Sequence, residues 1–150
     1  MKLQLQLDRQ SGLPILPVAL TYNGKSIYRL AVVDTGSTSS SITLETAKLL
    51  DIDLELTNRG KIVGVSGIKE TPVISEIGVI ILEVGKIINL KEIHILDDVK
   101  ITHPEKRSGI KIGERIEQAT IPNLLGLDFL KESGAKLVIS FKQQEFYIEL

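Results

Sequence analysis

One stretch of the sequence carries residue types that could do acid–base chemistry. The apolar segment 30–33, Leu-Ala-Val-Val, runs directly into the segment 34–38, Asp-Thr-Gly-Ser-Thr. A carboxylate held at the end of a buried strand can act as a general acid or base, and hydroxyl groups beside it can hydrogen-bond to it. The alternative is an ordinary turn, in which Asp34 and Thr35 serve only as turn formers. The apolar residues before the acid and the hydroxyl residues after the glycine favour the chemical interpretation.

The segments that precede the acid predict how it is positioned. Residues 15–22 read as a strand, and residues 26–33 read as a second strand that returns beside it. Between them stands Asn23-Gly24, the strongest two-residue signal for a β-hairpin. We therefore expect an antiparallel hairpin that places Asp34 at the end of its second strand.

The rest of the chain is predicted to be mostly β-structure with two short helices. Thr43 can cap a first helix that ends near Leu50, and a second helix runs from about Asp128 until Gly134 stops it. The other expected elements are a strand carrying Leu3, Leu5 and Leu7, a strand or extended loop over 51–56, a hairpin over 61–68, a long strand pair over 73–84 and 87–96 around Gly85-Lys86, a charged surface excursion over 97–119 with a short strand at 110–112, and a final hairpin of 135–141 and 145–150.

Composition restricts the classes of function that are open to this chain. With 150 residues, of which 43% are hydrophobic, we expect one globular domain over 1–150 with a single core. The net charge of −1 gives no electrostatic basis for binding nucleic acid or an anionic membrane. The chain has no cysteine, and neither His94 nor His103 has a second ligand at metal-binding spacing. We therefore expect no disulfide, no metal and no other cofactor.

The sequence also lacks the signals of a secreted or membrane-spanning protein. Residues 1–8 alternate apolar and polar side chains and do not form the continuous apolar segment of a signal peptide. No run of about 18 apolar residues is present, so we expect no membrane span. A cytoplasmic location is the expectation that follows.

Four features, in the same order along the chain, make this sequence resemble the retropepsin-like aspartic proteases, the single-lobed retroviral type. They are the hairpin turn at Asn23-Gly24, the Asp34-Thr35-Gly36 stretch, a glycine-bearing hairpin at 62–68, and the Leu124-Leu125-Gly126 stretch that opens a short helix. The resemblance covers nearly the whole chain and implies a closed, barrel-like β-fold with two short helices. One departure is the excursion at 97–119, which is longer than the corresponding connection of viral members.

The resemblance implies roles for individual residues. Asp34 is the catalytic carboxylate, and Thr35 braces its loop by bonding to the loop of the opposite subunit. Gly36 lets a backbone amide approach the carboxylate where a Cβ would clash, and Ser37 is expected to donate a hydrogen bond to the outer carboxylate oxygen. A flap that closes over a peptide substrate would comprise Val63, Gly64, Val65, Ser66 and Gly67, with the two glycines supplying its flexibility.

The number of aspartates predicts a homodimer. The mechanism implied by the resemblance needs two aspartates on facing loops, and the chain has one Asp-Thr-Gly stretch. Asp128 is expected to be a cap or a surface acid, while the adjacent Asp97 and Asp98 would point apart in a strand. The second carboxylate must then come from another copy of Asp34 across a two-fold axis.

The terminal strands are expected to belong to the same dimer interface. Segments 3–7 and 146–150 are apolar enough to need covering, and in the family the chain ends of both subunits interleave into one sheet. The alternative is that each strand packs within its own subunit.

Two functions from different classes remain open. The first is a homodimeric aspartic endopeptidase that hydrolyses peptide or protein substrates with a water activated by Asp34. The alternative is a non-catalytic module of the same fold that dimerises or binds extended peptides. The intact Asp34-Thr35-Gly36-Ser37 stretch favours the enzyme, because a binding module has no need for the acid.

Overall fold

The computed structural model of the chain describes residues 1–64, 67–119 and 121–150. Within this part the chain forms fifteen strands and two short helices, which confirms the prediction of a mostly β protein with two short helices. The helices are α1 (Leu44–Leu49) and α2 (Leu127–Ser133). The strands are β1 (Lys2–Gln4), β2 (Gln6–Leu7), β3 (Pro14–Tyr22), β4 (Lys25–Val33), β5 (Ser41–Thr43), β6 (Asn58–Gly64), β7 (Gly67–Ile74), β8 (Ile77–Ile81), β9 (Lys86–Leu90), β10 (Ile93–Leu96), β11 (Val99–Arg107), β12 (Ile110–Ala119), β13 (Asn123–Leu125), β14 (Lys136–Ser140) and β15 (Glu145–Glu149).

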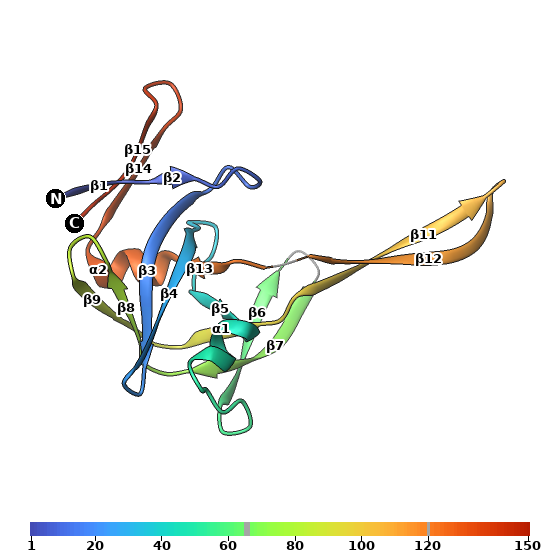
Figure 1. The fold of residues 1–150 in the computed structure, drawn as a ribbon, viewed down its shortest axis with the longest axis horizontal. Helices are drawn as coiled ribbons and strands as arrows, with labels where there is room; N and C mark the ends of the chain where they lie inside the picture. Colours follow the sequence, from blue (N-terminus) through green and yellow to red (C-terminus); the bar gives the residue numbers. More distant parts are fainter. Residues whose placement is uncertain (65–66, 120) are drawn as a thin grey trace.

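The strands are arranged in three sheets (Figure 1). The central sheet has ten strands in the order β6-β7-β10-β5-β13-β4-β3-β8-β9, with β2 added beside β3. A three-stranded sheet of order β1-β15-β14 contains both ends of the chain, and β11 and β12 form a ribbon of their own. In Figure 1 this ribbon, coloured yellow to orange, extends far from the rest of the molecule.

The hairpin that carries the acidic stretch forms as predicted. Asn23 and Gly24 both have positive φ, at 46° and 77°, which is the conformation that a two-residue type I′ turn requires. β3 and β4 pair antiparallel from Ile15↔Val32 to Tyr22↔Lys25 beside this turn. Ala31 and Val33 of β4 belong to the hydrophobic core, whereas Val32 between them faces the other side of the sheet.

The core is one cluster of buried aliphatic side chains together with Phe129 of α2. β3 contributes Leu16, Val18 and Leu20, which alternate with less buried residues as expected of a strand with one face in the core. Ile148 of β15 also belongs to this cluster, so the terminal sheet packs on the same core as the central one. β3 and β4 are therefore rigidly anchored where β4 leads into Asp34.

Both helices begin and end within one residue of the predicted bounds. The Thr43 hydroxyl caps α1 by accepting a hydrogen bond from the Thr46 amide at 3.1 Å. α2 ends at Gly134, which has a φ of 66° in the left-handed region that glycine adopts most easily. Neither of these described helices is long and apolar enough to cross a membrane.

The prediction of a closed barrel is wrong, because no sheet in the described part of the chain closes on itself. The central sheet ends at β6 on one side and at β9 on the other, and these two strands do not pair. β9 lies beside α2, where Lys86 Nζ donates a hydrogen bond to the Ser133 carbonyl at 2.7 Å. β6 belongs to a hairpin whose outer part is exposed to solvent. Closure would require β6 and β9 to pair, but β9 packs beside α2 and β6 pairs with β7.

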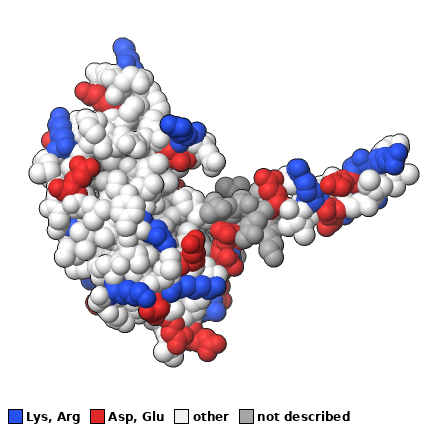
Figure 2. Space-filling view, viewed as in Figure 1, with Lys and Arg blue, Asp and Glu red and all other residues white. Residues whose placement is uncertain are grey.

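Residues 97–119 also differ from the prediction of an irregular excursion with one short strand. β11 and β12 pair antiparallel from Val99↔Ala119 to Arg107↔Ile110, with one irregularity after Glu105. The turn residues Ser108 and Gly109 both have positive φ, as in the Asn23-Gly24 hairpin. A Ser-Gly turn signal was therefore present in the sequence. Charged residues of both signs lie along the ribbon (Figure 2), so the period-two alternation typical of a strand is weak in this segment.

Two smaller differences have local causes. The strand pair predicted over 73–84 and 87–96 is split into β7 and β8, and into β9 and β10, at Glu76 and Glu92. These glutamates have φ values of 64° and 58°, which no regular strand allows. Segment 51–56 forms turns and no strand, in agreement with the loop alternative.

The terminal strands pair with each other inside one chain. β1 and β15 are antiparallel neighbours, with Leu3 opposite Ile148, and the amino group of Met1 donates a hydrogen bond to the Leu150 carbonyl at 3.0 Å. This pairing lies within one chain, and interleaving with the chain ends of a second subunit stays a prediction. β1 can satisfy its backbone groups within the chain because the two ends lie side by side.

Candidate active site

Asp34 lies where β4 enters a loop, as the sequence predicted. Its backbone N–H donates a hydrogen bond to the Leu125 carbonyl of β13 at 2.9 Å, so the last residue pairs of the sheet fix its position. The Gly36 amide donates to Asp34 Oδ1 at 2.9 Å, and a Cβ on Gly36 would lie 3.1 Å from that oxygen. The close amide approach expected of Gly36 is therefore present. The amide holds one carboxylate oxygen in place while the side chain stays half-exposed.

The residues that follow Asp34 differ in their exposure to solvent. Thr35 and Gly36 are exposed, so one face of the loop is open to solvent. Ser37 is half-buried, and its hydroxyl donates to the Ser39 carbonyl at 2.7 Å. The expected hydrogen bond from Ser37 to the Asp34 carboxylate is absent, because the Ser37 hydroxyl is used within the loop. Ser37 stabilises the shape of the loop in this structure.

The loop rests against the start of α2. The Leu127 amide donates to the Ser37 carbonyl at 2.8 Å, and the Asp128 amide donates to the Thr38 carbonyl at 3.3 Å. Gly126 permits this approach, since a Cβ there would lie 2.7 Å from the Ser37 carbonyl oxygen, closer than real Cβ contacts. The absence of a side chain at Gly126 is therefore what allows the two segments to touch.

Asp128 has a structural role that sequence reasoning missed. Its carboxylate accepts hydrogen bonds from the Ser40 amide at 2.9 Å and from the Ser40 hydroxyl at 2.7 Å. The Ser40 hydroxyl in turn accepts a hydrogen bond from the Gly126 amide at 3.0 Å. Asp128 is not the N-cap residue, which is Gly126, but its Oδ1 also accepts a hydrogen bond from the Phe129 amide in the first turn of α2 at 2.8 Å. It joins α2 to the loop, and no local pattern identifies a partner 88 residues away.

The hairpin of β6 and β7 presents the second group of predicted site residues. Val63 and Ile68 lie opposite each other near its tip with 78% and 71% of their surface exposed. Gly67 has a φ of 115°, a conformation that strongly favours glycine, whereas Gly64 does not have positive φ. Val65 and Ser66, also predicted to contact substrate, lie outside the described residues.

A buried polar pair anchors the base of this hairpin. The Thr71 hydroxyl and His94 Nδ1 lie 2.7 Å apart, and both residues are buried. The His94 amide donates to the Ser40 carbonyl at 3.2 Å, so β10 connects the hairpin base with the loop that follows Asp34. A Cβ on Gly60 of β6 would lie 2.5 Å from the Val73 side chain and 3.2 Å from the His94 ring. The hairpin is thus tightly packed at its base and exposed at its tip.

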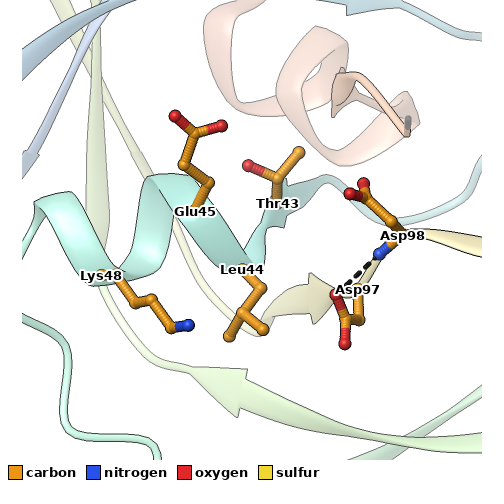
Figure 3. Close-up of a pocket in the computed structure, with 6 residues that line it drawn as sticks. All are labelled: Thr43, Leu44, Glu45, Lys48, Asp97 and Asp98. Carbon is orange, nitrogen blue, oxygen red and sulfur yellow. Dashed lines mark hydrogen bonds between the residues drawn. The ribbon is translucent and has the colours of Figure 1, made fainter. Parts of the chain in front are cut away.

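A further hollow lies beside α1, away from the acidic loop. It has a volume of about 350 Å³ and contains side chains of both charges (Figure 3). The Asp98 amide donates to Asp97 Oδ1 at 2.8 Å. The lining residues are Thr43, Leu44, Glu45, Lys48, Asp97 and Asp98. In the part of the chain that the structure describes, no three His, Asp or Glu side chains converge as metal ligands would.

No family model matches this sequence, and a search of curated proteins found no match. Among solved structures, the chain is similar to a retropepsin-like aspartic protease from Rickettsia conorii, with a TM-score of 0.58 and 18% sequence identity. That alignment covers 99% of this chain and 89% of the other. This chain has a retropepsin-like fold. The EIAV protease complexed with the inhibitor HBY-793 is also similar, at 20% identity and a TM-score of 0.47 over 89% of this chain and 100% of that chain.

The retropepsin-like fold brings together residues that are distant in the sequence. Its central sheet places β13 between β4 and β5, so Gly126 and Asp128 reach the loop that starts at Asp34. The hairpin of β6 and β7 follows in the same sheet through β10. One loop and one hairpin of the fold therefore carry all the predicted site residues that the structure describes.

Proposed function

We propose that this chain is an aspartic endopeptidase whose active unit is a homodimer. The observation that carries the proposal is the geometry of Asp34, whose Oδ1 accepts the Gly36 amide at 2.9 Å while the carboxylate stays accessible. The loop around it is fixed by backbone hydrogen bonds to β13 and α2. An acid held in this way can meet substrate without a rearrangement of the main chain.

The proposed chemistry is hydrolysis of a peptide bond by an activated water. Two carboxylates close together cannot both ionise, so the pair shares one proton, and aspartic proteases are the established example. The ionised carboxylate takes a proton from the water as it attacks, and the protonated one donates to the carbonyl oxygen of the scissile bond. Activity is then expected to peak on the acidic side of neutral, between the two apparent pKa values of the pair.

A second copy of the chain supplies the second carboxylate in this proposal. Asp128 is already bonded to Ser40, and Asp97 and Asp98 line the separate hollow beside α1. The exposed Thr35 and Gly36 form the open face of the loop. Two such faces related by a two-fold axis would bring two Asp34 side chains together and cover both loops.

The hairpin of β6 and β7 is the proposed flap of this enzyme. Val63 and Ile68 at its tip are apolar and exposed, which suits contact with an extended peptide when the hairpin closes. Its packed base, with the Thr71–His94 pair, provides a fixed support for movement of the tip. The substrate proposed on these grounds is a peptide or an unfolded protein segment.

The test compares wild-type protein with Asp34→Asn and with Asp53→Asn, which removes an exposed acid in the loop after α1. An unfolded protein is incubated with each across pH 3 to 8, and fragments are identified by mass spectrometry with and without pepstatin. We expect cleavage by the wild type and by Asp53→Asn, and loss of at least about a thousandfold in rate for Asp34→Asn. Undiminished cleavage by purified Asp34→Asn would contradict the proposal. Peptide binding without cleavage by the wild type would favour the binding module instead.

A further inference from the structure

A second cavity lies beside the end of β4, on the side of the sheet away from the core. Its volume is about 440 Å³, and its lining combines two apolar residues with three polar ones. We call it the Asp8 pocket. It is lined by Asp8, Gln10, Ser11, Val32 and Pro122.

The Asp8 pocket lies next to the end of β4, which leads into Asp34. Val32, which lines the pocket, is two residues before Asp34, so their Cα atoms are about 7 Å apart in extended chain. Val32 is buried yet does not belong to the core cluster that contains Ala31 and Val33. Across the sheet, Val32 pairs with Ile15, which pairs with Gln6 of β2. Asp8 is two residues beyond Gln6 and lines the pocket together with Val32.

The carboxylate of Asp8 is held in one orientation by its own turn. Its Oδ2 accepts hydrogen bonds from the Ser11 amide at 2.7 Å, the Ser11 hydroxyl at 2.8 Å and the Gln10 amide at 3.2 Å. The Asp8 amide and carbonyl close the turn through Leu13 and Gly12, each at 2.8 Å. The hydrogen bonds from Ser11, its amide first, lower the pKa of Asp8 below the ordinary value for a carboxyl group. The Asp8 carboxyl group therefore ionises more readily than an ordinary carboxyl group.

Within the described residues, the Asp8 carboxylate has no ion-pair partner. Among the side chains that the structure describes, no lysine, arginine or histidine forms an ion pair with Asp8, including its neighbour Arg9. All three hydrogen bonds to its side chain end on Oδ2, and Oδ1 accepts none within the described residues. A fixed anion with one unused oxygen, next to an apolar surface formed by Val32 and Pro122, is complementary to a cation on an aliphatic stem.

We propose that the Asp8 pocket binds a lysine or arginine side chain of the substrate, close to the bond that is cleaved. The aliphatic part of that side chain lies on Val32 and Pro122, and its cationic end bonds to Asp8 Oδ1 and to the side chains of Gln10 and Ser11. This inference rests on the proposed peptidase function, and it names the class of substrate. In the homodimer each subunit contributes one such pocket, so basic residues are favoured on either side of the scissile bond.

A binding experiment tests the pocket without requiring cleavage. Fluorescent octapeptides with a central apolar pair carry Lys, Gln or Glu at one position, which is moved through the three positions on each side of the pair. Their affinities for Asp34→Asn are measured by fluorescence anisotropy at low ionic strength. For at least one position on each side, we expect the Lys peptide to bind about fivefold more tightly than the Gln peptide, and the Glu peptide to bind more weakly still. Equal affinities of Lys and Gln peptides at all positions would overturn the inference.

Variants identify Asp8 as the source of this preference. Adding Asp8→Asn keeps an oxygen that can accept the Ser11 hydrogen bonds but removes the charge, so the Lys preference should fall to within about twofold. The matched control is Asp53→Asn, because Asp53 also accepts a backbone amide in an exposed turn, that of Glu55 at 3.0 Å. The control should keep the full preference. Its loss in Asp53→Asn, or its persistence in Asp8→Asn, would mean that the pocket does not recognise the cation.

A cleavage experiment with the wild type separates the two proposals. If the same Lys peptides are cut faster than the Gln peptides, and Asp34→Asn cuts neither, both proposals stand. Cleavage that depends on Asp34 without any Lys preference would overturn the pocket and leave the peptidase intact. A Lys preference in binding with no cleavage by the wild type would overturn the peptidase and leave a binding site for basic peptides.

Discussion

The loop that begins at Asp34 and the ribbon of β11 and β12 are held in place by different kinds of backbone contact. The loop is short, and its amides and carbonyls bond to residues 125–128, which are distant in the sequence. In the described part of the chain, each strand of the ribbon pairs only with the other. Its isoleucines Ile110, Ile112 and Ile116 stay more than half exposed. Long-range backbone bonds fix a site, whereas local pairing alone gives a regular but weakly supported element.

Hydrogen exchange followed by mass spectrometry or NMR should show the largest difference between the two regions. Amides of β4 and β13 can exchange only through opening of the core sheet, whereas those of β11 and β12 need only local separation of two strands. We expect exchange at least about a thousandfold slower in β4 and β13. Comparable protection in the ribbon would mean that something else covers it in solution.

A pair of glycine substitutions tests the same contrast through packing. A Cβ on Gly126 would meet the Ser37 carbonyl oxygen at 2.7 Å, so Gly126→Ala must displace the loop. We expect it to lower the free energy of unfolding by about 2 to 3 kcal/mol and to reduce any peptidase activity. Gly113→Ala in the ribbon meets no atom within 4 Å and should change stability by less than about 0.5 kcal/mol. Urea denaturation of both variants measures this, and equal effects would contradict the contrast.

Substitution of one acidic residue in each region tests the same comparison, with smaller expected losses of stability. Asp128→Ala leaves the Ser40 amide and hydroxyl without their acceptor and should cost about 2 kcal/mol. Glu117→Gln removes the ribbon's pair with His103 Nε2, which lies 2.9 Å away while the Glu117 side chain is 59% exposed. We expect that change to cost less than about 0.5 kcal/mol. A larger loss of stability in Glu117→Gln than in Asp128→Ala, measured by urea denaturation, would reverse the comparison.

Substitution of Asp8 should give the smallest change in stability, and this change should depend on pH. Because folding lowers the pKa of Asp8, its ionised form contributes stability at pH values above the ordinary carboxyl value of 3.8. That contribution is lost as the pH falls through the lower value in the folded protein. Asp8→Asn should therefore melt at a slightly lower temperature than the wild type at pH 7 and at the same temperature near pH 2. A difference that persists at pH 2 would show that the amide perturbs the turn itself.

The hairpins and caps show which parts of the fold could be predicted. The Asn23-Gly24 turn, the Thr43 cap and the Gly134 stop were found because each depends on residues within a few positions of one another. The position of Asp34 at the end of a buried strand followed from the same kind of signal. Ser108-Gly109 is an equally local turn signal, but the many charged residues around it mask the alternation of its flanking strands.

The sequence by itself determined the strand, the acid and the glycine of the loop, because backbone preference and alternation act over short distances. Only the tertiary structure decided that the sheet stays open, that Ser37 bonds within the loop, that Asp128 holds Ser40, and that Asp8 lies beside Val32. Each of these depends on which of several possible partners a group meets when strands far apart in the chain become neighbours. A hydrogen-bonding group takes the partner that the fold brings within about 3 Å, and a one-dimensional pattern contains no such distance.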